Sequence, residues 1–182
     1  MPTDAKTATF GALGFVLFAI SACTACNNEW TGWDDVPTAT ITPRASTAHD
    51  AEWTAFVTDQ AAVWANILAP FGCAPPFVVG DGGHVVELVP ASDWSYGDGV
   101  GGMTTDVIEV REAKTGGVRR SSMLLHELGH ALGLDHADAA FGASIMTAKV
   151  GTAIAARDVA AAACRLGCGP CDPQADPYAI GP

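Results

Sequence analysis

Residues 126–136 read HELGHALGLDH and contain three of the chain's five histidines. On a helix, residues four apart share a face with Cβ atoms about 5–6 Å apart, so His126 and His130 can bind one metal ion together. His136 would face away from that ion if the helix continued. Gly133 lets the chain turn first, because glycine adopts the left-handed conformation at a helix end without steric cost. The spacing therefore predicts a three-histidine metal site.

This set of ligands predicts a catalytic zinc ion. Three histidines leave the fourth tetrahedral position of zinc open to water, which is typical of catalytic rather than structural sites. Glu127 follows the first ligand, and the offset of about 100° per residue on a helix places its carboxylate beside the metal without binding it. Zinc lowers the pKa of bound water toward about 7, so Glu127 can accept the proton as the water attacks a carbonyl carbon. We therefore expect peptide-bond hydrolysis with one Zn²⁺ and Glu127 as the catalytic base.

Two further helices are predicted on either side of this region. Apolar residues recur at helical spacing over about 20 residues, between a start signal at Thr47 and Pro70. The metal-binding helix is expected to follow the turn at residues 116–117 and to end at Gly133. A last helix is predicted over about residues 153–166.

Three segments between the first two helices are typical of strands, because they are rich in β-branched residues and bounded by glycine or proline. They lie at residues 76–80, 84–89 and 106–111, and a glycine-rich loop is predicted at 97–102. This order of elements predicts an α+β fold, in which helices back a small sheet.

The N-terminal residues predict export. An apolar stretch over residues 10–21 follows Lys6 and has the length of a secretory signal. It ends in ISAC, which resembles the bacterial lipobox, so we expect a lipoprotein-type signal peptide over 1–22 and a membrane anchor through lipid on Cys23. An ordinary signal peptide, cut near Ala22 or Ala25, is the alternative. Both place the mature chain outside the cytosol, either secreted or in the cell envelope, on the outer membrane where the host has one.

The rest of the chain is expected to form one domain. A polar tether is predicted over residues 23–38, with Trp30 and Trp33 able to dock on the body. The catalytic domain is expected over 39–167, and a cysteine- and proline-rich tail over 168–182.

The charge of the chain excludes one class of partner. Lysine and arginine total 9 against 20 acidic residues, which gives a formal charge of −11. This charge repels phosphate backbones, so we expect no nucleic-acid partner. No apolar run reaches the roughly 18 residues that a membrane-spanning helix needs, which argues against a polytopic membrane protein.

These features resemble the metzincin metalloproteases, whose signature HExxHxxGxxH precedes a methionine-bearing turn beneath the zinc. Here the residues SIMT at 144–147 match that turn, with Met146 as the methionine. The resemblance covers about residues 39–167 and is greatest to the matrixin branch. It implies a zincin fold with a small mixed twisted sheet backed by helices, a zinc helix, a Met-turn and a C-terminal helix. It also implies a protein or peptide substrate, bound in extended form along an edge strand next to residues 106–111.

The sequence departs from individual branches of that family. Ala137 follows the third histidine, where astacins carry an acid and matrixins typically a serine, so the branch stays open. Ala148 stands where astacins and serralysins carry a tyrosine that assists the transition state. Stabilisation of the oxyanion is therefore expected to come mainly from the zinc itself.

The cysteines are expected to form structural disulfides. The CGPC at residues 168–171 also occurs in thioredoxin-like redox sites, but here it follows a helix and enters the proline-rich tail. We expect Cys73 to pair with Cys164, Cys168 or Cys171, which would connect the first helix to the end of the chain.

Other ligands and functions stay open. Acid- and glycine-rich loops around Asp81, Asp98 and Asp106 leave Ca²⁺ open as a second metal, although they contain no complete ligand pattern. His49 and His84 are expected to be surface or loop residues rather than ligands.

The alternative function is that of a zinc-binding surface lipoprotein without catalytic turnover, acting as an adhesin or interaction module. The presence of Glu127 argues against it, because binding zinc requires only the histidines. The oligomeric state cannot be derived from the sequence.

Overall fold

The computed structural model describes residues 32–45, 50–96, 100–112, 117–137, 144–147 and 153–171. Several sequence-based expectations concern residues outside these ranges. They are the signal peptide over 1–22, Cys23, Trp30, Thr47, His49, Asp98, Ala148 and the tail beyond residue 171.

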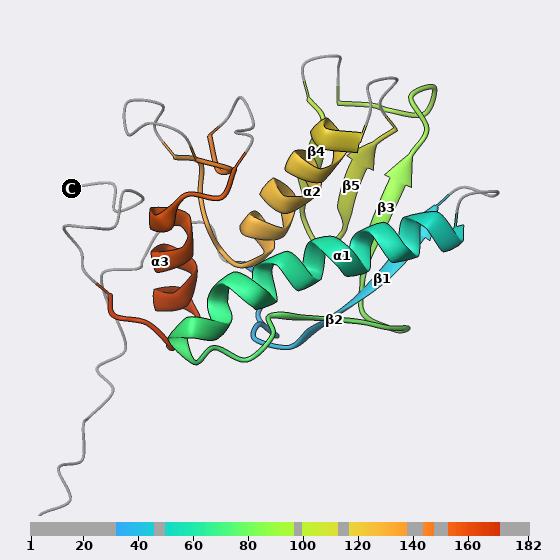
Figure 1. Cartoon of the computed structure of the whole chain (residues 1–182). Coiled ribbons are helices and arrows are strands. Elements are labelled where there is room, and N and C mark those ends of the chain that lie inside the picture. The colour runs from blue at the N-terminus through green and yellow to red at the C-terminus, as the bar shows by residue number, and fades with distance from the viewer. Residues whose placement is uncertain are drawn as a thin grey trace, which may run out of the picture.

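Within these ranges the chain forms five strands, three α-helices and one short 3₁₀ helix (Figure 1). In chain order they are β1 (Ala39–Ala45), α1 (Asp50–Leu68), η2 (Ala69–Phe71), β2 (Phe77–Val79), β3 (His84–Val89), β4 (Gly102–Thr104), β5 (Ile108–Arg111), α2 (Gly117–Ala131) and α3 (Ala156–Arg165).

The strands form one mixed sheet in the order β2-β1-β3-β5-β4. The first four strands of this order run parallel, and β4 pairs antiparallel with β5 at one edge. The three strands predicted from the sequence correspond to β2, β3 and β5, and the three predicted helices to α1, α2 and α3. The α+β prediction is therefore confirmed.

No residue range is predicted from the sequence for β1 or for β4, although the family resemblance implies an edge strand beside β5. Strand β1 contains Pro43, which lacks the N–H that a central strand donates and so argues against a strand. Pro43 is accommodated because only residues 39–41 of β1 pair with β2, so that one side of Pro43 needs no partner. The loop predicted over 97–102 is wrong at its end, because Gly102 begins β4. Glycine weakens strands on average, but here it leaves room for a side chain of α2.

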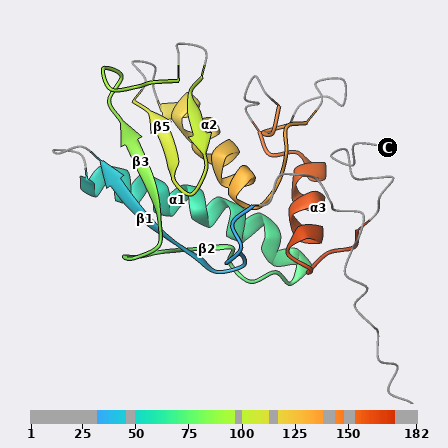
Figure 2. The same ribbon diagram turned by 180° about the vertical axis from the view of Figure 1, so that it is seen from behind.

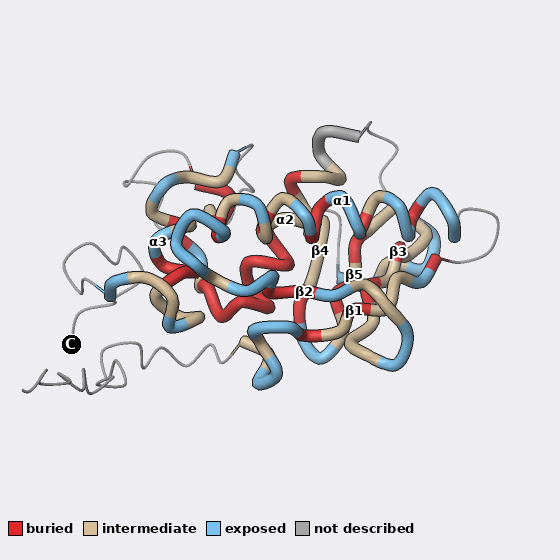
Figure 3. Tube along the Cα trace, turned by 60° about the horizontal axis from the view of Figure 1, so that its bottom comes forward, coloured by how far each residue is buried: buried red, intermediate tan, exposed pale blue. Residues whose placement is uncertain are grey.

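Helices α1 and α2 cover one face of the sheet, and the strands are seen in front of them from behind (Figures 1 and 2). Two indole N–H groups connect α1 to its neighbours. Trp53 donates to the carbonyl oxygen of Val86 in β3 at 2.9 Å, and Trp64 donates to that of Leu125 in α2 at 3.1 Å. Buried and exposed residues alternate along α1 in Figure 3, as expected for a helix with one face on the core.

Two disulfides involve cysteines at the C-terminal end of the domain. Cys73 pairs with Cys168, which confirms that the end of α1 is joined to the end of the chain, and Cys164 pairs with Cys171. Because Cys168 and Cys171 bond to different partners, they do not form a thioredoxin-like redox pair with each other. Such disulfides are consistent with a protein that functions outside the cytosol. None of the helices among the described residues is long and apolar enough to cross a membrane.

Residues 32–38 belong to the predicted tether, and they lie on the body of the domain. The indole of Trp33 donates to the carbonyl oxygen of Thr105 at 2.7 Å and stacks on the ring of His84, with the centroids 3.9 Å apart. His84 therefore lies in strand β3, half-buried under an aromatic ring, rather than in a loop. Its Nε2 also lies 3.1 Å from a carboxylate oxygen of Asp35. The expected docking of Trp33 is confirmed.

Candidate metal centre

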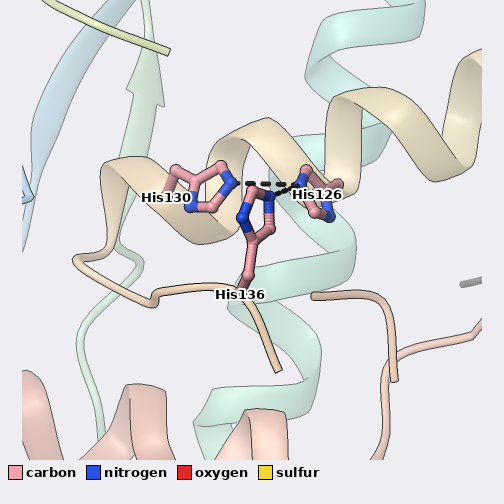
Figure 4. Close-up of side chains that lie close together, drawn as sticks. All are labelled: His126, His130 and His136. Atoms are coloured by element: carbon pink, nitrogen blue, oxygen red, sulfur yellow. Dashed lines mark hydrogen bonds between the residues drawn. The ribbon is translucent and has the colours of Figure 1, made fainter. Parts of the chain in front are cut away.

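Three histidine side chains converge between α2 and the chain that follows it (Figure 4). His126 and His130 lie one turn apart on α2, and their Nε2 atoms are 3.0 Å apart. His136 comes from the loop after the helix, and its Nε2 lies 3.3 Å from that of His126. The two helical histidines are buried and His136 is exposed, so the group opens to solvent on one side. The structure thus brings together the three ligands predicted from the sequence.

Gly133 produces the turn that delivers His136. Helix α2 ends at Ala131, and Gly133 has a φ of 82°, in the left-handed region that favours glycine. The N–H of Gly133 donates to the carbonyl oxygen of His130 at 2.7 Å. The next N–H, that of Leu134, donates to Gly129 at 3.0 Å. These bonds close the helix end and reverse the chain, as the sequence predicts.

Backbone carbonyl groups fix the proton on both helical rings. The Nδ1 of His126 lies 2.6 Å from the carbonyl oxygen of Ile145, and the Nδ1 of His130 lies 2.7 Å from that of Leu134. A carbonyl oxygen only accepts hydrogen bonds, so each Nδ1 carries the proton of its neutral ring and each Nε2 is unprotonated. Burial lowers the pKa of both rings, that of His130 to about 4, so the neutral form is favoured.

This arrangement fits a bound cation. Two unprotonated nitrogens 3.0 Å apart repel each other unless a positive charge lies between them. Neutral imidazole is also the form that binds metal ions. The three histidines could therefore hold one metal ion. Among the described residues, no second group of three His, Cys, Asp or Glu side chains that could hold a metal ion is found.

Glu127 directly follows His126 on α2 and is not part of the three-histidine group. Its side chain is buried, and burial raises the pKa of the carboxyl group to about 7. The hydroxyl group of Thr104 in β4 donates to Oε2 of Glu127 at 2.7 Å. That the Glu127 carboxylate lies beside the metal stays a prediction. The contact with Thr104 could not be found from the sequence, because 23 residues separate the two.

Residues 144–147 form a turn beneath the histidines. Ile145 accepts the hydrogen bond from His126, and Met146 is fully buried. A Cβ atom added to Gly129 of α2 would overlap the sulfur of Met146, so the thioether lies directly against the helix backbone between the two histidines. The N–H of Ala137, which follows His136, donates to the carbonyl oxygen of Met146 at 2.8 Å. The turn therefore contacts both segments that carry the ligands.

Asp158 of α3 holds this turn in place. It is fully buried and accepts hydrogen bonds from the hydroxyl group of Ser144 at 2.6 Å and from the N–H of Ile145 at 3.1 Å. It also accepts one from the N–H of Ala155, at the start of α3, at 2.8 Å. This role is not predicted from the sequence. An acid in the first turn of a helix is a common feature, and nothing in the local sequence distinguishes one that reaches a distant turn.

Comparison with known proteins adds no further assignment. No family model matches the chain, and no curated protein is significantly similar to it.

Proposed function

We propose that this protein is a zinc-dependent endopeptidase that works outside the cytosol. The observation that carries the proposal is Glu127, a buried carboxylate that directly follows His126 on the helix bearing two of the three converging imidazole rings. Isolated carboxylates are costly to bury, and a site that only bound metal would not need one. The two separations of 3.0 and 3.3 Å support zinc as the metal. Nitrogens bound to tetrahedral zinc at about 2.0–2.1 Å lie about 3.3 Å from one another.

Each part of the site has a role in this reaction. When bound, zinc supplies Lewis acidity, which polarises a carbonyl group and makes water more acidic. Glu127 accepts the proton of the attacking water and passes it to the amine that leaves, so no covalent intermediate with the protein is needed. The buried rings of His126 and His130 stay fixed by the carbonyl groups of Ile145 and Leu134.

The edge position of strand β4 favours a polypeptide as the substrate. It is an edge strand, and its pairing within the described residues is with β5 alone. The inner face of β4 lies against Glu127. An extended peptide that pairs with the free edge of a strand gains backbone hydrogen bonds along its length. The edge of β4 would therefore hold a peptide bond close to the base, which favours cleavage within a chain.

The test compares zinc content with hydrolysis of a fluorescently labelled unfolded protein. Glu127→Gln keeps the three ligands, so it should retain about one zinc ion per chain while its rate falls by about 10²- to 10⁴-fold. His130→Ala should lose both zinc and activity, because a ligand is missing.

Glu87→Gln is the matched control, since it removes a carboxylate from β3, outside the three-histidine group. It should keep the wild-type rate. Full activity of Glu127→Gln would refute the mechanism. A wild-type protein that binds zinc and cleaves no substrate would instead favour a non-catalytic surface protein.

A further inference from the structure

Two of the three residues of strand β4 face helix α2, which carries Glu127. In the pairing with β5, Gly102 lies opposite Val110 and Thr104 lies opposite Ile108. Val110 and Ile108 are fully buried, and side chains directly opposite on paired strands share a face of the sheet. Gly102 and Thr104 are therefore on the inner face, which α2 covers.

The hydroxyl group of Thr104 is committed to Glu127. The side chain of Thr104 is buried, and its Oγ1 lies 2.7 Å from Oε2 of Glu127 and 3.1 Å from the backbone oxygen of the same residue. A hydroxyl group has one proton to donate, and the shorter contact to a carboxylate oxygen is the stronger bond. Within the described residues, Oε1 of Glu127 has no hydrogen-bond partner, so the two carboxylate oxygens are not equivalent.

Gly102 closes the other side of the carboxylate. A Cβ atom added to this glycine would lie 2.5 Å from Oε1, 2.7 Å from Cγ and 2.8 Å from Cδ of Glu127. Such distances are shorter than any normal contact between these atoms. The carboxyl group therefore lies flat against the backbone of Gly102, in space that only glycine leaves.

We propose that Thr104 is a positioning residue for Glu127. Its hydroxyl group holds Oε2 while the bare backbone of Gly102 limits rotation of the carboxyl group. Oε1 is thereby presented to the attacking water in one orientation. In the reaction, an O–H bond of water breaks as the water oxygen bonds to the carbonyl carbon, and the proton bonds to Oε1. The proton then passes to the amide nitrogen as the C–N bond breaks and the amine leaves. This inference rests on the proposed function, because it assigns Glu127 as the base.

The kinetic test uses two substitutions at position 104 and one neighbour. Thr104→Val keeps the shape and removes the hydroxyl group, so kcat should fall by about 10- to 100-fold, the value of one hydrogen bond to a charged group, with KM and zinc content unchanged. Thr104→Ser restores the hydroxyl group and should recover most of kcat. Thr105→Val is the matched control, because Thr105 is exposed and its hydroxyl group hydrogen-bonds to the backbone of Val107, away from Glu127. It should keep the wild-type kcat.

A second measurement does not depend on activity. Urea unfolding of the zinc-free protein is compared for wild type, Thr104→Val, Glu127→Ala and the double variant. Thr104→Val should lower the unfolding midpoint when Glu127 is present and change it much less when position 127 is alanine. This difference is the signature of a direct interaction between two side chains.

The outcomes separate the two proposals. Wild-type kcat in Thr104→Val, no recovery in Thr104→Ser, or the absence of coupling in the unfolding cycle would each overturn the role of Thr104. If the zinc-loaded wild type hydrolyses no peptide, the proposed function fails. Even without peptidase activity, coupling between positions 104 and 127 in the unfolding cycle would still support a carboxylate held by Thr104. The absence of that coupling would overturn the role of Thr104.

Discussion

Asp158→Asn should weaken both the fold and the metal site, because Asp158 holds the turn whose Ile145 carbonyl group accepts from the ring of His126. The two carboxylate oxygens have different partners. Oδ2 accepts the N–H groups of Ile145 and Ala155, and Oδ1 accepts the hydroxyl group of Ser144. An asparagine can place its carbonyl oxygen where Oδ2 lies, but its amide group then faces the hydroxyl oxygen of Ser144. That hydroxyl group already accepts the N–H of Met146 at 3.0 Å and loses its charged acceptor.

The expected size of the effect follows from these contacts. Loss of one hydrogen bond to a charged group corresponds to about 1.5–3 kcal/mol in the free energy of unfolding. Asp158→Ala removes every acceptor from a fully buried site and should cost about 3–5 kcal/mol. Zinc binding should weaken as well, because Ile145 both donates to Asp158 and accepts from the ring of His126. Loss of such supporting contacts typically reduces metal affinity by about 10- to 100-fold.

Two assays measure these effects. Urea unfolding of the zinc-free protein gives the stability, and competition with a chromogenic chelator gives the zinc affinity. Asp59→Asn is the control, because Asp59 is an exposed residue of α1. It should match wild type in both assays. If Asp158→Asn also matched wild type in both, the connection from α3 through the turn to His126 would be refuted.

Three further predictions concern the turn, the disulfide and the membrane anchor. Gly133→Ala places a methyl group at a φ of 82° and should cost about 1–2 kcal/mol of stability. It should also reduce the zinc content, because this turn delivers His136, and wild-type zinc content would contradict this. Replacing Cys73 and Cys168 together by serine opens a disulfide that spans 95 residues and should lower the unfolding free energy by up to about 4.7 kcal/mol, measured by urea unfolding. An unchanged urea midpoint would rule this out. We also propose that Cys23 carries lipid, so Cys23→Ala should move the protein from the membrane to the soluble fraction. Recovery of wild type in the soluble fraction, with an unmodified N-terminus, would exclude the anchor.

The parts of this protein that the sequence predicts are those with local causes. The spacing of His126 and His130, the turn at Gly133 and the periodicity of α1 are each determined by residues within a few positions of one another. Strand β1 is missed because the suitability of Pro43 depends on where the pairing with β2 stops. That is a property of the sheet, which the strand by itself does not encode.

The same reasoning explains the supporting residues of the site. Thr104 and Asp158 act through contacts with residues 23 and 14 positions away, and neither belongs to a periodic pattern. A threonine in a short glycine-containing segment and an acid at a helix start each have a common local explanation. Their roles become visible only when the turn, the helix and the edge strand are placed together.

The position of the N-terminal segment determines how far the metal centre could travel from a membrane. Gly32 lies so close to Gly133 that a side chain at residue 32 would overlap its backbone, and the N–H of Trp33 donates to the carbonyl oxygen of Ala131 at 3.0 Å. The chain thus joins the body beside the turn that precedes the third histidine, nine residues after Cys23. Nine residues extend at most about 32 Å. With lipid on that cysteine, the metal centre would meet other proteins of the same surface at an effective concentration set by this short reach, and not by the amount of the protein in the surrounding volume.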